Sequence, residues 1–372
     1  MTEHTTDKLF QIEDVYNYSD ENRKLFIESV KEMFQFHYER SQIFRGICDQ
    51  YNFTLQDIQN ENDIYRIPHI FVTAFKKMKI LSLPEEEIVI TLTSSGTQGQ
   101  KSQTNLDQIT LDRQTAIRAN TVKSMGMLSE EKVNTIVFSY DPATGGDRGA
   151  AYTFRMYSSF APSEEMFYAL KPGVAGEPVF ELEKSIEKII EFSLTGLPLR
   201  VIGFLAFSFV TFKEMKKRGI KLQFPSSSLL LTGGGWKSHT GETVDFEGYA
   251  ELVESVLGIK RDRIRDFFGM VEHGIPYMSC PQRHFHIPVY AKACAIDPGT
   301  LAVLPKGEAG LLKLITTFSR SVPSISVLST DIGLVESNCP CGIPGNYIVL
   351  KGRGGVQKHA GCAISASQLI KI

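Results

Sequence analysis

Strand-like and helix-like segments alternate between residues 111 and 232, which limits this chain to few architectures. Val133 to Tyr140 and Arg200 to Phe207 are apolar runs rich in β-branched and aromatic residues, which is typical of buried strands. Such alternation favours an α/β fold in which helices flank parallel strands and ligands gather at the strands' carboxyl ends. We expect helices over residues 20–50, 111–127, 180–194 and 209–218, and a further strand from Ser228 to Thr232.

Composition excludes several classes of function. The 372 residues carry a formal charge of −2 with both signs mixed along the chain, so we expect no nucleic-acid partner. The N-terminus is polar and no apolar run approaches about 18 residues, so we expect no transmembrane segment and a cytoplasmic protein. Six cysteines in a chain of this length do not form a secreted disulfide pattern. We interpret the Lys-rich stretch from Phe75 to Lys79 as a solvated surface turn or short helix.

A segment rich in glycine and hydroxyl side chains follows the apolar run from Ile88 to Leu92. In the sequence TSSGTQGQKS of residues 93–102, two glycines allow the backbone to turn closely around a ligand, so that several N–H groups can point at one anion. The spacing is not that of the Walker loop, and a flexible polar loop is the alternative. The predicted phosphate-binding residues are Thr93, Ser94, Ser95, Gly96, Thr97, Gly99 and Lys101.

This segment resembles the phosphate loop of the adenylate-forming enzymes, which join a carboxylate to AMP. Four later segments resemble other motifs of the same superfamily. The motifs are Gly233-Gly234-Gly235 after a strand, Phe268-Gly269-Met270-Val271-Glu272, Ser329-Thr330-Asp331, and Gly352-Arg353 with Lys358. The resemblance implies that adenine lies against the three glycines, that Glu272 holds Mg²⁺, and that Asp331 binds the ribose of ATP. It assigns anionic contacts to Arg353 and Lys358, and catalytic roles to Lys101, Glu272 and Lys358. Taken singly, glycine turns, a solvated glutamate and an Asx cap explain these residues as well.

The C-terminal sequence narrows the resemblance. Gln357-Lys358 and Gly361-Cys362-Ala363-Ile364-Ser365 are similar to the acyl-protein synthetases of bacterial bioluminescence. That family activates a long-chain fatty acid as acyl-AMP and passes the acyl group to a cysteine near its own C-terminus, matched here by Cys362. An acyl reductase then forms aldehyde, and an acyl-transferase is a further expected partner. A small buried residue is the alternative role for Cys362.

The resemblance also predicts the domains. We expect an adenylate-forming core over residues 1–350, including a helical segment over 1–85, and a hinge-like tail over 351–372 that carries Cys362. The hinge is shorter than the family's and lacks its aspartate, and only ten residues follow Cys362. We therefore expect the full mobile C-terminal domain of the superfamily to be lacking.

Four of the remaining soft ligands form two pairs, Cys280 with His286 and Cys339 with Cys341. A zinc ion takes three cysteines and one histidine as a tetrahedral site. His284 is an alternative to His286, and all four residues can also be uncoordinated. Cys48 and Cys294 lie among apolar neighbours and are expected in the core. Similar pairs occur in relatives of phenylacetate-CoA ligase, so an acyl- or aryl-CoA ligase is one alternative function. A non-catalytic subunit that binds acyl groups or nucleotides is another.

Overall fold

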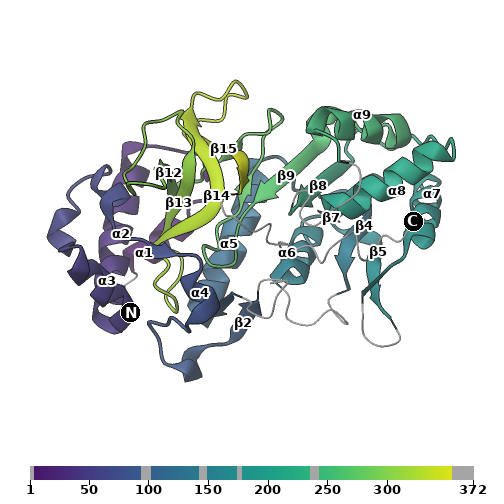
Figure 1. Ribbon diagram of the computed structural model, residues 1–372. Helices are drawn as coiled ribbons and strands as arrows, with labels where there is room; N and C mark the ends of the chain where they lie inside the picture. The colour runs from purple at the N-terminus through teal and green to yellow at the C-terminus, as the bar shows by residue number, and fades with distance from the viewer. Residues whose placement is uncertain (1–3, 94–101, 142–148, 174–177, 235–242, 354–372) are drawn as a thin grey trace. The chain divides into compact units, whose positions relative to one another are not determined.

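A computed structural model describes residues 4–93, 102–141, 149–173, 178–234 and 243–353 (Figure 1). These residues divide into two compact units. Described residues 4–93, 102–125 and 269–353 form unit 1, and described residues from 126 to 268 form unit 2. The chain therefore leaves unit 1 and returns to it. The predicted boundary between residues 350 and 351 falls inside the last strand, β15 (Asn346–Arg353).

Unit 2 contains the predicted parallel sheet. Its strands lie in the order β9-β8-β7-β4-β5-β6, and only the β5–β6 pair is antiparallel. All the residues of β4 and β7 are buried, as expected for strands covered on both faces. The strands are β4 (Val133–Tyr140), β5 (Ser163–Pro172), β6 (Pro178–Phe180), β7 (Leu199–Phe204), β8 (Leu229–Gly233) and β9 (Ile264–Phe268). The helices are α6 (Gly149–Ser158), α7 (Leu182–Ser193), α8 (Leu205–Lys217) and α9 (Phe246–Leu257).

Unit 1 is built around a mainly antiparallel sheet, which the sequence analysis did not predict. Its order is β11-β15-β14-β13-β12, with β1 paired in parallel to β14. The strands are β1 (Ile70–Phe71), β11 (Phe285–His286), β12 (Ala291–Ile296), β13 (Gly310–Thr316), β14 (Ser326–Ser337) and β15. A separate hairpin joins β2 (Ile90–Thr93) to β3 (Gln103–Leu106), and β10 is Tyr277–Met278. The helices are α1 (Thr5–Phe10), α2 (Asp20–Arg40), α3 (Gln42–Gln50), α4 (Ala74–Lys77) and α5 (Gln108–Ser124).

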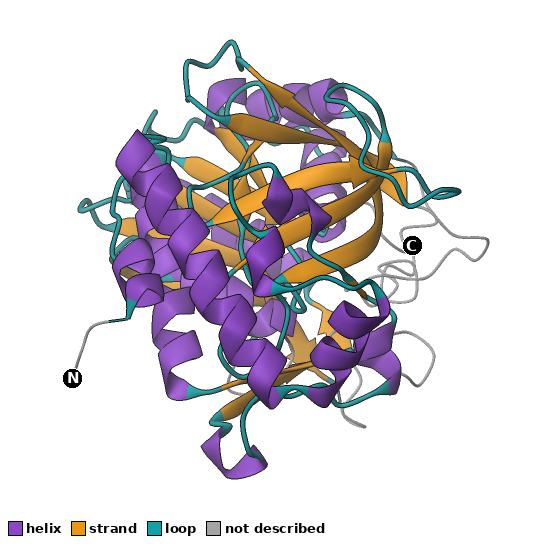
Figure 2. Cartoon of the chain, turned by 90° about the vertical axis from the view of Figure 1, so that its left-hand side faces the viewer, coloured by secondary structure: helices purple, strands orange, loops and turns teal. Residues whose placement is uncertain are grey.

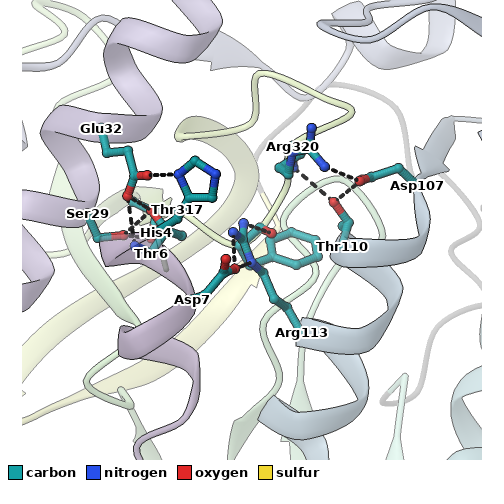
Figure 3. A network of polar contacts seen from close by, with 11 residues as sticks. His4, Thr6, Asp7, Ser29, Glu32, Asp107, Thr110, Arg113, Thr317 and Arg320 are labelled. Atoms are coloured by element: carbon teal, nitrogen blue, oxygen red, sulfur yellow. Dashed lines mark hydrogen bonds and ion pairs between the residues drawn. The ribbon is translucent and has the colours of Figure 1, made fainter. Parts of the chain in front are cut away.

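Figure 2 shows the described helices, strands and loops in separate colours. Polar contacts fasten the N-terminal helix α1 to its neighbours in unit 1 (Figure 3). The Glu32 carboxylate of α2 accepts hydrogen bonds of 2.8 Å from both the backbone N–H and the hydroxyl of Thr6. Asp7 accepts from the buried Arg113 of α5, with an Nε–Oδ1 distance of 2.9 Å. Arg113 also donates to the carbonyl of Phe318 at 3.2 Å. The contacts thus extend from the N-terminus to the segment around Phe318.

The secondary structure corrects several predicted boundaries, and α5 begins and ends three residues earlier than the helix predicted over 111–127. The predicted helix over 20–50 is two helices, because Ser41 has extended backbone angles and its hydroxyl caps α3 by accepting from the Phe44 N–H. The predicted strand from Arg200 ends at Phe204, where α8 begins four residues earlier than expected. Phe180 belongs to β6, so α7 begins at Leu182. The strand at 133–140 and the buried positions of Cys48 and Cys294 are confirmed.

Acidification is expected to destabilise unit 1 through His37. This buried ring lies 2.7 Å from the Ser82 hydroxyl and 3.1 Å from the Ser319 carbonyl, and burial lowers its pKa from 6.5 to about 3. The unfolded chain therefore binds a proton that the folded chain does not, so His37's contribution to stability is complete above pH 6.5 and falls toward pH 3. The loss is about 1.4 kcal/mol per pH unit within that window.

Urea unfolding of the wild type and of His37→Gln at several pH values measures this effect. The stability advantage of the wild type is expected to shrink steadily between pH 6 and pH 4.5, by about the slope that one proton gives. A difference between the two proteins that does not change with pH would show that His37 is not the group responsible.

Candidate active site

The β2–β3 hairpin holds the two ends of the predicted phosphate loop together. Thr93 and Gln103 are directly opposed in the antiparallel pair, and the Thr91 hydroxyl donates to the Asn105 side chain at 2.8 Å on the same hairpin. Ser102, the last residue of the motif, is fully buried. Thr93 and Ser102 therefore belong to unit 1 at one end of this hairpin.

A tight turn carries Glu272. The Met270 carbonyl accepts hydrogen bonds from the backbone N–H groups of His273 at 3.2 Å and Gly274 at 2.9 Å. Gly274 has a φ of +76°, and a Cβ there would lie 2.1 Å from the Phe318 ring. Only glycine satisfies both conditions. Arg113 donates a hydrogen bond to the carbonyl of Phe318, the residue whose ring lies against Gly274.

Glu272 is a buried carboxylate among polar groups from distant parts of the sequence. Burial raises the pKa of Glu272 above its ordinary value, and the negative charge of Asp331 adds to the rise. A hydrogen bond from Ser102 and the positive charge of Lys76 act on the pKa in the opposite direction. Three predicted parts of the site, the loop end, the glutamate and the aspartate, therefore interact within unit 1.

The pairing of β14 explains how Lys76 comes near Asp331. Because β13 occupies one edge of β14 opposite residues 326–333, β1 and β15 must share the other edge. β1 pairs with Val327 and Leu328, and β15 pairs from Asp331 onward. Asp331 therefore lies just beyond the residues of β14 that pair with β1. The helix α4, which carries Lys76, follows β1 directly in the chain, so Lys76 comes close to Asp331. Asp331 also lies directly opposite Arg353, so two residues predicted to bind nucleotide are cross-strand partners.

The predicted adenine-binding glycines Gly233 and Gly234 belong to unit 2, and so does Phe268, which was predicted as a cofactor-binding residue together with Gly269 and Met270. β8 and β9 are parallel neighbours, so Gly233 and Phe268 lie at the same carboxyl edge of the sheet. A Cβ on Gly233 would lie 2.5 Å from the Phe267 ring. Gly234 has a φ of +82° and passes close to Phe204. Contacts inside unit 2 are therefore enough to require both glycines, whatever lies against them.

Gly269 and Met270, two more of the predicted cofactor-binding residues, lie beside Glu272. Several other predicted residues lie outside the described part of the chain. The predictions outside it are Ser94, Ser95, Gly96, Thr97, Gly99, Lys101, Gly235, Lys358 and Cys362. Sequence reasoning missed Lys76, and it included Ser102 in the phosphate-loop motif without assigning it a role. Lys76 was interpreted as part of a solvated face, but it is half-buried, whereas its neighbour Lys77 is exposed. The sequence offers only one indication of a role for these two residues, which is that each is polar and adjoins a predicted structural element.

The two cysteine and histidine pairs meet in unit 1. One ligand atom from each of Cys280, His286, Cys339 and Cys341 lies within 4.8 Å of the others. The Cys280 and Cys339 sulfurs are 3.7 Å apart, and the Cys341 sulfur is 3.3 Å from His286 Nε2. Burial raises the pKa of Cys339 to about 12 and lowers that of His286 to about 4. The alternative ligand His284 has its Nδ1 3.0 Å from the Cys339 sulfur.

Solved structures of adenylate-forming ligases share this fold. An open-conformation 2-hydroxyisobutyryl-CoA ligase in complex with 2-HIB-AMP and CoA matches with a TM-score of 0.66 and 16% identity, over 92% of this chain and 76% of that one. A long-chain-fatty-acid-CoA ligase from Archaeoglobus fulgidus matches with a TM-score of 0.50 and 13% identity, over 73% and 52%. The predicted α/β adenylate-forming fold is confirmed.

Comparison of the sequence identifies one family among the proteins that share this fold. Residues 2–371 match the family model "Acyl-protein synthetase, LuxE". The long-chain-fatty-acid--luciferin-component ligase of Aliivibrio fischeri is 26% identical over 354 residues, which cover 95% of this chain and 90% of the relative. That of Vibrio harveyi is 24% identical over 94% of this chain and 89% of the relative. The chain belongs to the LuxE acyl-protein synthetase family and is a ligase. Among the described helices, none is both long and apolar enough to pass through a membrane.

Proposed function

We propose that this ligase activates a long-chain fatty acid with ATP and transfers the acyl group to its own Cys362. The observation that carries the proposal is the extent of the family match, which runs through residues 2–371 and so includes Cys362 and every motif named above. The cluster of Ser102, Glu272 and Asp331 supports it, because these residues are three separate parts of the predicted ATP site.

The proposed reaction has two steps. An oxygen of the fatty acid carboxylate attacks the α-phosphorus of ATP, the bond to pyrophosphate breaks, and acyl-AMP forms. The Cys362 thiolate then attacks the acyl carbon, a C–S bond forms, and AMP leaves with the electrons of the broken C–O bond. A cysteine with its ordinary pKa of about 8.5 is only a few per cent thiolate at neutral pH. Lys358 is proposed to favour the thiolate by its positive charge.

The residues of the described site suit the roles assigned to them. Glu272, Asp331 and Ser102 offer hard oxygen ligands, which Mg²⁺ prefers, and Glu272 is the residue proposed to hold this ion. Mg²⁺ bound there would neutralise phosphate charge. Asp331 is proposed to accept hydrogen bonds from the ribose, while Lys101 and Arg353 bind phosphate. Gly233, Gly234, Gly235 and Phe268 are proposed to contact adenine.

Delivery of the acyl group follows from the chemistry of its thioester. A thioester remains activated, so a reductase can accept the acyl group and reduce it to an aldehyde. We therefore propose an acyl reductase as partner, with an acyl-transferase as a source of the fatty acid. Because the reaction consumes ATP and needs a reduced thiol, we place it in the cytoplasm.

Exchange of labelled pyrophosphate into ATP tests the first step. Exchange is expected only when ATP, Mg²⁺ and a long-chain fatty acid are all present, since the step is reversible through acyl-AMP. ATP binding without exchange for any carboxylic acid would support a non-catalytic subunit instead. Exchange followed by stoichiometric acyl-CoA formation, with no acyl group on the protein, would support a CoA ligase.

Lys76 is expected to be a positioning residue for Glu272. Lys76→Ala removes the positive charge that stabilises the ionised carboxylate, so we expect about a tenfold fall in the rate of pyrophosphate exchange, which corresponds to about 1.4 kcal/mol. Lys77→Ala is the matched control, because Lys77 is exposed on the same short helix. Lys76→Arg keeps the charge and is expected to restore most of the rate. Equal effects of Lys76→Ala and Lys77→Ala, or no rescue by arginine, would contradict this role.

A further inference from the structure

The cluster of Cys280, His286, Cys339 and Cys341 lies apart from the residues proposed to bind ATP, and its geometry is that of a metal centre. Zinc bound tetrahedrally with Zn–S distances of about 2.3 Å and a Zn–N distance of about 2.0 Å places two sulfurs about 3.8 Å apart and a sulfur and nitrogen about 3.5 Å apart. The Cys280 and Cys339 sulfurs are 3.7 Å apart, and the Cys341 sulfur lies 3.3 Å from His286 Nε2. These two distances match tetrahedral zinc, and all four ligand atoms lie within 4.8 Å of one another, which places them around one point.

We propose that these four residues bind one structural zinc ion. Three cysteines and one histidine complete a tetrahedral shell and leave no position for a water or substrate, which is the pattern of structural zinc. Cys280, His286 and Cys339 are buried, so the ligand atoms of these three residues face the cluster rather than solvent. Thiolates also select zinc over the oxygen-preferring Mg²⁺ and Ca²⁺.

The structure separates the roles of the two histidines. His286 Nε2 faces the Cys341 sulfur and belongs to the set of mutually close ligand atoms. His284 instead stacks on Tyr347, with ring centroids 4.1 Å apart, and its Nδ1 lies 3.0 Å from the Cys339 sulfur. We assign His286 as the ligand and His284 as the group that donates a hydrogen bond to the Cys339 thiolate. Such outer contacts orient a ligand without binding the metal.

The position of the ion indicates what it stabilises. Cys280 precedes the turn that leads into β11 and His286 is the last residue of β11, while Cys339 and Cys341 lie in the turn between β14 and β15. Zinc therefore connects two turns that no disulfide joins among the described residues. From Ser337 at this turn to Asp331 the strand runs six residues, or about 20 Å at about 3.3 Å per residue. The ion thus anchors the hairpin that carries Asp331 and Arg353 without taking part in the reaction, and the inference does not depend on the proposed function.

Metal analysis of the purified full chain tests the proposal. The protein is prepared in reducing buffer without a polyhistidine tag and dialysed, and about one zinc ion per chain is expected. His286→Ala and Cys339→Ser are expected to lose the zinc. Cys294→Ser, a buried cysteine of the same sheet outside the cluster, is expected to keep it. His284→Ala is expected to keep zinc but to release it to a competing chelator with an affinity about 10- to 100-fold weaker than the wild type.

A second measurement covers variants that fail to fold. Cobalt substituted into the wild-type chain is expected to give the intense visible bands of tetrahedral Co²⁺ together with thiolate-to-cobalt charge-transfer bands. A thiol reagent added to the zinc protein is expected to release the ion in proportion to the cysteines modified. A reduced wild-type chain without zinc, an octahedral cobalt spectrum, or a disulfide between Cys280 and Cys339 in its place would overturn the proposal. So would full zinc retention by His286→Ala.

Discussion

Cys362→Ala is expected to abolish covalent labelling of the protein by a radioactive long-chain fatty acid in the presence of ATP. The substitution removes the sulfur that captures the acyl group, so the label should fall to the level seen without ATP. Pyrophosphate exchange should remain close to that of the wild type, because acyl-AMP formation does not use the thiol. Gel electrophoresis with autoradiography measures the label, and hydroxylamine should release it from the wild type, as expected for a thioester.

Cys294→Ala provides the control for this experiment. Burial raises the pKa of Cys294 to about 11, so its thiol is not expected to react, and the variant should be labelled like the wild type. Full labelling of Cys362→Ala would refute the assignment of the acceptor. Loss of both labelling and exchange would instead indicate that the C-terminal segment is needed for the first step.

Glu272→Gln is expected to cause the second large effect, a fall of about a hundredfold or more in pyrophosphate exchange. That loss corresponds to about 2.7 kcal/mol of transition-state stabilisation. Glutamine keeps the size of the side chain and a hydrogen-bond acceptor for Ser102, but it removes the charge proposed to hold Mg²⁺. Because Glu272 is buried with a raised pKa, the neutral replacement should not lower stability, which thermal unfolding measures.

Glu336→Gln is a suitable comparison for Glu272→Gln. Glu336 lies on β14, the strand that also carries Asp331, at a position that pairs with Tyr347 near the far turn. Its replacement should leave exchange unchanged. If Glu272→Gln retains the wild-type rate over a range of Mg²⁺ concentrations, then Glu272 does not hold the catalytic magnesium.

Local sequence predicted the strands of unit 2 well where residue types change at their ends. The strand from Val133 to Tyr140 is bounded by polar residues, and its predicted limits are those observed. At Phe204 the apolar residues continue from β7 into α8, and the first turn of α8 has no side-chain cap, so no local signal marks the boundary. The sheet of unit 1 was not predicted. Its strands β12 to β15 pair antiparallel with their neighbours in sequence, but the sequence analysis assigned no strand to residues 285–353, and the parallel pairing of β1 with β14 joins segments too distant for a local pattern.

The site also contains residues that local sequence predicts and residues that depend on contacts between distant segments. Motifs identified Glu272 and Asp331, because each stands in a short recognisable sequence. Lys76 was missed because its role depends on the pairing of β1 with β14, which no local pattern encodes. For the metal centre, the residue types were visible in the sequence. The choice between His284 and His286 was not, since it depends on which ring nitrogen faces which sulfur across 55 residues of chain.

Mass spectrometry of the intact protein after incubation with ATP, Mg²⁺ and a long-chain fatty acid tests the central claim most directly. The account predicts a mass increase equal to the fatty acid less one water, dependent on ATP, removed by hydroxylamine and located by digestion on the peptide that contains Cys362. An unchanged protein mass under conditions that consume ATP and fatty acid, or an acyl group mapped to another residue, would contradict it.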